Sequence, residues 1–181
     1  GNNLMIMGVL ARTITARQML RNWLVVYLGN FAGALLVAAL CVSGHVFSAF
    51  GGKLAASVVT IAQTKAGLSF GDAFVRGILC NFLVCIAVWM ANAARTVGGK
   101  IAAVFFPIMA FVVAGFEHSV ANMYYLAAGL FTAGQTGAAA EGLTWGRALI
   151  GNLLPVTLGN LVGGGLLVGV SAWYLYLKKE I

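Results

Sequence analysis

The stretch that decides the fold reads IAAVFFPIMAFVVAGF (101–116), then Glu117, His118 and Ser119, then VANMYYLAAGLF (120–131), and neither flanking run carries a charged residue. A straight helix needs about 20 apolar residues to cross roughly 30 Å of hydrocarbon. Each run is too short to cross alone, and together they are too long for one straight crossing. The pattern therefore predicts a membrane crossing that is interrupted near its centre. Ionisable side chains at that depth usually face a cavity or a pathway.

The composition predicts an all-α membrane protein. Of the 181 residues, 61% are hydrophobic and only 8% are charged, whereas soluble domains carry about 25% charged residues. Backbone groups in lipid must be satisfied internally, and the apolar runs are longer than the roughly 10-residue strands of outer-membrane barrels. The net charge of +7 is scattered near the ends of the expected spans, so we expect the lipid bilayer, and no nucleic acid, as a partner.

The cysteines do not indicate a metal site. Cys41, Cys80 and Cys85 lie in apolar stretches without the spacing of metal ligands, so we interpret them as packing residues. We expect neither a metal nor a cofactor.

The apolar runs predict full spans at 23–44, 74–94 and 153–177, a half-helix at 4–10, and an external, partly helical connection at 46–70. One set of basic residues falls on the side that the positive-inside rule makes cytoplasmic: Arg12, Arg17, Arg21, Arg95, Lys100, Lys178 and Lys179. The other side holds fewer: Lys53, Lys65, Arg76 and Arg147. We therefore expect a multi-pass protein of the inner (plasma) membrane with a cytoplasmic C-terminus.

Two segments of the chain align without gaps. NWLVVYLGNFAGALLVAAL (22–40) and NLLPVTLGNLVGGGLLVGV (152–170) share Leu-Gly-Asn-x-x-Gly, and we call them the first and the second LGN segment. The expected topology runs them in opposite directions, which is the inverted repeat of many transporters. The repeat predicts a second interrupted crossing just before residue 22, and it predicts that the protein is longer than this chain.

The N-terminal residues supply a candidate for that second interruption. We expect the half-helix that starts at Leu4 to be capped by Asn2 or Asn3, and the half-helix after the first interruption to be capped by Ser119. Helix N-termini present free N–H groups and a positive dipole end, so this centre would favour an anion.

Several motifs resemble the formate/nitrite transporter family, pentameric channels for small monovalent anions. They are Phe-Glu-His-Ser-Val-Ala-Asn-Met (116–123), Arg-Asn-Trp (21–23), Gly-Ile-Leu-Cys-Asn-Phe-Leu-Val-Cys (77–85) and Leu-Pro-Val-Thr-Leu-Gly-Asn (154–160). The resemblance implies an aquaporin-like inverted-repeat helical bundle with two broken helices. Residues 1–181 would form one channel domain with repeat halves at about 1–44 and 71–181. Its first span and a half would precede Gly1.

The resemblance also implies roles for individual residues. His118 corresponds to the central pore histidine, and Phe111 to the apolar constriction on the cytoplasmic side. Lys65 corresponds to an external lysine that concentrates the anion, and Asn81 to an amide near the histidine.

The N-terminal motif departs from the family pattern. Leu4 and Met5 stand where the family places a gating Leu-Phe pair, within Gly-x-acid-Leu-Phe-Thr. This chain has Asn3 at the acidic position and Ile6 in place of the threonine, whose hydroxyl could bond to the substrate or the histidine. Hydrosulfide is therefore a candidate substrate beside formate and nitrite.

These residues suggest a proton-assisted mechanism. A bare anion loses its hydration at an apolar ring such as Phe111, whereas a neutral weak acid does not. His118 is the natural proton donor or relay, because the unperturbed pKa of histidine is about 6.5. We place Ser119 in the pore and interpret Glu117 and Asn122 as structural residues beside it.

Three other classes stay open. An aquaporin-like channel for neutral solutes would normally carry paired Asn-Pro-Ala motifs, which this sequence lacks. An intramembrane enzyme would use Glu117 and His118 as acid and base, and a non-transporting scaffold or sensor would use neither. The anion, the choice between channel and proton symport, and gating are also left open.

Overall fold

The computed structural model describes residues 2–178, so Gly1 and Lys179 to Ile181 lie outside the described part. Within residues 2–178 the regular structure is entirely helical. The α-helices are α1 (Met5–Leu10), α2 (Ala16–Ser43), α3 (Lys53–Ala66), α4 (Phe70–Ala93), α5 (Val97–Val113), α6 (Ser119–Thr136) and α7 (Leu154–Asn160). Short 3-10 turns are η1 (Asn2–Leu4), η2 (Val46–Ser48) and η3 (Phe50–Gly52). Wider π-helical turns extend α7 into one C-terminal helix: η4 (Arg147–Leu153), η5 (Leu161–Val170) and η6 (Trp173–Leu177).

The three predicted spans are confirmed as helices. Among the described residues, three helices are long and apolar enough to cross a membrane: Ala16–Ser43, Phe70–Ala93 and Arg147–Leu177. The helix of the crossing's first half, α5, is apolar but shorter.

Polar caps explain why two spans begin earlier than the hydrophobic pattern predicts. At the start of α2, Thr15 N–H donates to Gln18 Oε1 (2.8 Å) and Gln18 N–H donates to Thr15 Oγ1 (3.2 Å). This reciprocal capping box moves the helix start to Ala16, so Arg17 and Arg21 lie in its first turns and not in a link. At α4, Asp72 N–H donates to Ser69 Oγ (3.1 Å), and the helix begins at Phe70.

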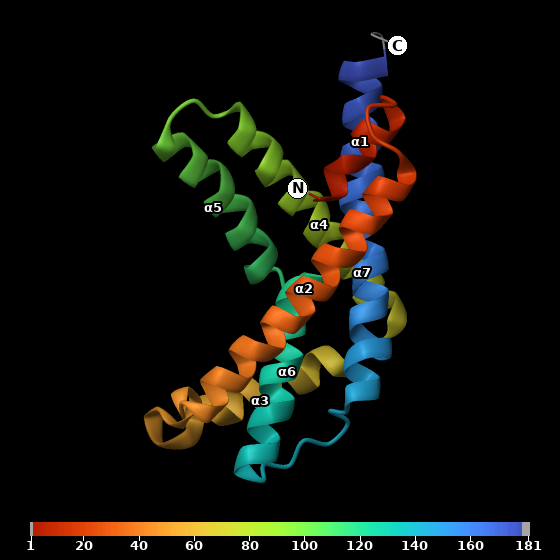
Figure 1. The fold of residues 1–181 in the computed structure, drawn as a ribbon. Coiled ribbons are helices and arrows are strands. Elements are labelled where there is room, and N and C mark those ends of the chain that lie inside the picture. Colours follow the sequence, from red (N-terminus) through yellow and green to blue (C-terminus); the bar gives the residue numbers. More distant parts are fainter. Residues whose placement is uncertain (1, 179–181) are drawn as a thin grey trace. The chain divides into compact units, whose positions relative to one another are not determined.

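The described chain divides into two compact units. Of the described residues, the first unit comprises 2–25, 74–118 and 156–178. In this unit α1 packs alongside η5 of the C-terminal helix (Figure 1). Glycines on that helix also allow close packing against α4, because a Cβ on Gly163 would collide with the backbone oxygen of Ile78.

The second unit comprises residues 26–73 and 119–155. Its largest contact joins α3 and α6, which Figure 1 shows crossing each other. Met123 and Leu126 of α6 are buried against Ala62 of α3, and the contact depends on Gly129, where a Cβ would collide with the Ala62 side chain. The predicted connection at 46–70 therefore contains a packed helix of 14 residues.

Candidate functional site

The predicted interruption of the crossing lies between α5 and α6. Helix α5 ends at Val113, and α6 begins at Ser119. Gly115 adopts a φ of +66°, a conformation that favours glycine, and Phe116 N–H donates to the Phe111 carbonyl at 3.0 Å. The turn therefore ends α5 and leads directly into Glu117 and His118.

Asn160 holds the interruption in place. This side chain is 3% exposed, and its Nδ2 donates to the Glu117 carbonyl (3.0 Å) and to the Gly77 carbonyl (2.9 Å). Glu117 N–H donates to the Arg76 carbonyl at 3.3 Å. Backbone groups in a membrane interior need partners inside the protein, and α4 and the C-terminal helix supply them here.

His118 and Phe111 meet across this turn. Their rings stack with centroids 6.0 Å apart at an angle of 25°. Phe111 is buried and His118 is half-buried. An ionisable ring and an apolar ring thus lie in direct contact at the interruption.

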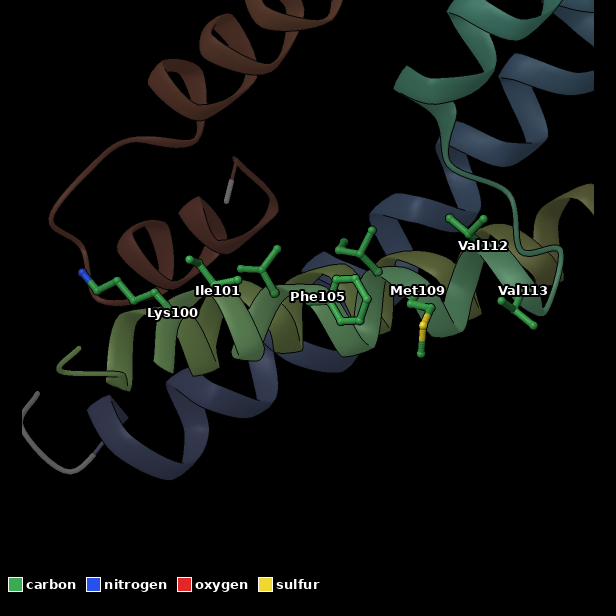
Figure 2. Close-up of a pocket in the computed structure, with 8 residues that line it drawn as sticks. Lys100, Ile101, Phe105, Met109, Val112 and Val113 are labelled. Atoms are coloured by element: carbon green, nitrogen blue, oxygen red, sulfur yellow. The ribbon is translucent and has the colours of Figure 1, made fainter. Parts of the chain in front are cut away.

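A separate feature of α5 is a shallow apolar groove along the helix (Figure 2). Ile101, Phe105 and Met109 line it, with Lys100 at one end, and Phe111 is not among its lining residues. The groove is distinct from the contact between Phe111 and His118.

The expected cap of the N-terminal half-helix is wrong. The N-cap position of α1 is Leu4, and within the described residues no side chain caps it. Asn2 Oδ1 instead accepts a hydrogen bond from Asn22 Nδ2 (3.2 Å), and Asn3 Nδ2 donates to the Asn160 carbonyl (2.9 Å). The two amides instead tie the start of the half-helix to the spans beside it.

Met5 and Ile6, which follow in the chain, also contact neighbouring spans. Asn22 Nδ2 lies 3.0 Å from Met5 Sδ. Ile6 lies against Gly169 so closely that a Cβ on this glycine would come within 2.5 Å of Ile6 Cγ2. The side chain that replaces the family's threonine therefore packs on the C-terminal helix.

Lys65 belongs to the second compact unit. It lies in the last turn of α3, and its Nζ is 5.4 Å from the centroid of the Tyr125 ring on α6. Its carbonyl accepts a hydrogen bond from Asn152 Nδ2 at 2.9 Å.

The other predicted site residues are buried polar groups. Asn81 lies in α4, and its Oδ1 accepts the Cys85 S–H at 3.4 Å. Ser119 is the first residue of α6 and is buried. Asn122, which is 1% exposed, donates from Nδ2 to Asn152 Oδ1 at 2.8 Å. The structure thus joins Asn122 to Lys65 through a residue that was not predicted to belong to the site.

Sequence reasoning did not place Asn152 or Asn160 in the site. Both side chains are buried and hydrogen-bonded to other helices or to the interruption. The available signal was an asparagine in an apolar span at the position that the LGN alignment pairs with Asn22 or Asn30.

The fold and the interrupted crossing define an all-helical integral membrane protein. The family described as formate/nitrite transporter matches residues 1–174, and the chain belongs to this family. It is 42% identical over 174 residues to the formate channel FocA of Haemophilus influenzae, covering 90% of this chain and 61% of that one. It is 38% identical over 188 residues to the probable formate transporter of Methanothermobacter thermautotrophicus, covering 96% and 65%.

A solved structure gives the same result. The chain matches a pentameric formate channel with formate bound, with a TM-score of 0.81, 37% identity, and coverage of 91% of this chain and 69% of that one. The names of these relatives describe transport and not catalysis. The chain spans 61% to 65% of the length of the two curated relatives.

Proposed function

We propose that the full-length protein is a membrane channel or transporter for small monovalent anions of weak acids, namely formate, nitrite or hydrosulfide. The observation that carries the proposal is the stacked pair of His118 and Phe111 at the interrupted crossing. Formate is the first candidate, because the relatives are named for it. Hydrosulfide is the second candidate. Ile6 stands where the family pattern has a threonine, so the hydroxyl that a strongly hydrogen-bonding anion would use is missing.

The proposed mechanism converts the anion into a neutral acid. Stripping water from an ion costs many kcal/mol in an apolar setting, so an apolar ring such as Phe111 blocks the bare anion. A proton delivered at His118, directly or by relay, yields an acid that passes the ring. Histidine suits this role because its unperturbed pKa, about 6.5, lies close to physiological pH.

Other residues would support this step. Lys65 would raise the local anion concentration at the external end, since a fixed cation attracts counter-ions within a Debye length of about 8 Å. Leu4 and Met5 would form the second apolar constriction, with Ser119 and Asn81 lining the path between. Glu117 and Asn122 would hold this region structurally, which their burial supports.

The relatives also suggest the assembly. We infer a homopentamer in the inner membrane with the C-terminus cytoplasmic, because a solved relative is pentameric and the basic residues favour this orientation. Each protomer would carry one channel domain built from two inverted halves. Its partners would be the anion, a proton and the lipid bilayer.

Uptake into proteoliposomes tests the proposal. The full-length protein and His118→Asn are compared for formate, nitrite and hydrosulfide at external pH 5.5 and 7.5. We expect fast uptake of at least one anion that increases at the lower pH, and loss of this pH dependence in the variant. Movement of water or glycerol without any anion would instead identify an aquaporin-like channel for neutral solutes.

A further inference from the structure

The end of α3 depends on a side chain from another helix. The last four carbonyl groups of a helix have no intrahelical partner, and the Lys65 carbonyl is one of these in α3 (Lys53–Ala66). Asn152 Nδ2 donates to this carbonyl at 2.9 Å, and Leu68 N–H approaches it at 3.4 Å. Of these two hydrogen bonds to the Lys65 carbonyl, the one from the Asn152 side chain is therefore the shorter.

Asn152 also binds the beginning of α6. Its Oδ1 accepts the hydrogen bond from Asn122 Nδ2 at 2.8 Å, and its side chain is 0% exposed. A carbonyl only accepts, so Asn152 has to present its NH₂ group to Lys65 and its oxygen to Asn122. This orientation uses both ends of one buried amide to join the end of α3 to the first turn of α6.

The side chain of Lys65 faces the same helix. Its Nζ lies 5.4 Å from the Tyr125 ring centroid, within the range of a cation–π contact. Tyr125 follows Asn122 by three residues, so both side chains project from one side of α6. The backbone of Lys65 is thus held to α6 through Asn152, and its ammonium group through Tyr125.

We propose that Asn152 is a positioning residue for anion collection, which sets the place of the Lys65 ammonium group relative to the start of α6. The inference rests on the proposed function, because it requires Lys65 to collect the anion. Without the Asn152 amide, the last turn of α3 loses its hydrogen-bonded link to α6, and Lys65 spends less time at its position. The anion is then captured less well, while its passage through the crossing is unchanged.

The test measures initial formate uptake against formate concentration in proteoliposomes with the full-length protein. Asn152→Ala raises the half-saturating concentration by about fivefold and leaves the maximum rate within about twofold. Lys65→Gln raises it by at least as much. The double variant shows no more than the Lys65→Gln shift, because both changes act on one step.

Gln135→Ala is the matched control. Gln135 Nε2 also donates to a backbone carbonyl of another helix, that of Val42 at 3.0 Å, but it lies outside the contacts of Lys65. We expect Gln135→Ala to have the same half-saturating formate concentration as the wild type. A general loosening of the fold would shift Asn152→Ala and Gln135→Ala alike, which would overturn the inference.

Other outcomes of the same measurements also decide whether the inference holds. A lower maximum rate at unchanged half-saturation in Asn152→Ala, or shifts that add in the double variant, would show that Asn152 does not act through Lys65. If Asn152→Ala yields no folded protein, Asn122→Ala removes the bond from Asn122 Nδ2 to Asn152 Oδ1 and must still raise the half-saturating concentration. Absence of uptake by the wild type, or no effect of Lys65→Gln, would defeat the proposed function and not this inference alone.

Discussion

The two LGN segments share a sequence pattern but differ in packing. In the second segment, a Cβ on Gly159 or Gly163 would collide with the backbone of α4. In the first segment, a Cβ on Gly29 or Gly33 would find no atom of residues 2–178 within 4 Å. The same small-residue pattern is therefore a close helix contact in one half and an open face in the other.

The asparagines of the two segments differ in the same way. Asn160 is buried and donates to the Glu117 carbonyl in the interruption and to the Gly77 carbonyl of α4, whereas Asn30 is half-buried. Small residues let membrane helices approach closely, and an amide then fixes the contact. The comparison shows that the second segment organises the candidate site, and it identifies the face of the first segment that remains open.

The largest effect is expected at the close contact. Gly163→Leu forces a side chain into the Ile78 backbone, which cannot move aside, so we expect a loss of more than about 3 kcal/mol. Gly33→Leu meets open space and changes stability by less than about 0.5 kcal/mol. Thermal unfolding of the full-length variants in detergent measures both. Equal losses would contradict the comparison and show that something outside residues 2–178 packs on Gly33.

The next largest loss of stability is expected from substitution of the buried Asn160 side chain. Asn160→Ala removes one hydrogen-bond donor from the Glu117 carbonyl and one from the Gly77 carbonyl, and the loss of a partner costs about 1–3 kcal/mol for a buried polar group. We therefore expect a loss of about 2 to 3 kcal/mol, together with most of the anion flux, because His118 follows Glu117. Asn30→Ala is the matched change in the first segment, and less than about 1 kcal/mol is expected from it. A similar fall in anion flux for Asn160→Ala and Asn30→Ala would contradict the assignment of the site to the second segment.

A smaller effect than at Gly163 or Asn160 is expected where the first segment meets the N-terminal half-helix. Asn22 donates to Asn2 Oδ1 at 3.2 Å in a partly exposed position, so water replaces the bond when it is lost. Asn22→Ala should cost about 1 kcal/mol in unfolding experiments. If Asn22→Ala lowered the free energy of unfolding as much as Asn160→Ala does, the N-terminal half-helix would be held as firmly as the interruption at Glu117.

Much of the fold follows from the hydrophobic pattern, because span length and the two short runs around Glu117 are set by local composition. Helix starts were less predictable, since the caps at Thr15 and Ser69 extend helices into polar sequence. The stacking of His118 on Phe111 was not predicted, and the pore roles of these two residues stay a prediction. The roles of Asn152 and Asn160 depend on which helices meet in space, and no spacing along the chain reveals that.

The central claim is that the anion crosses as a neutral acid after taking up a proton at the interrupted crossing. The most direct test follows luminal pH and membrane current together when formate is added outside proteoliposomes that contain the full-length protein. The account predicts acidification of the lumen without net current, and loss of the acidification in His118→Asn. A formate current without luminal acidification in the wild type would contradict it.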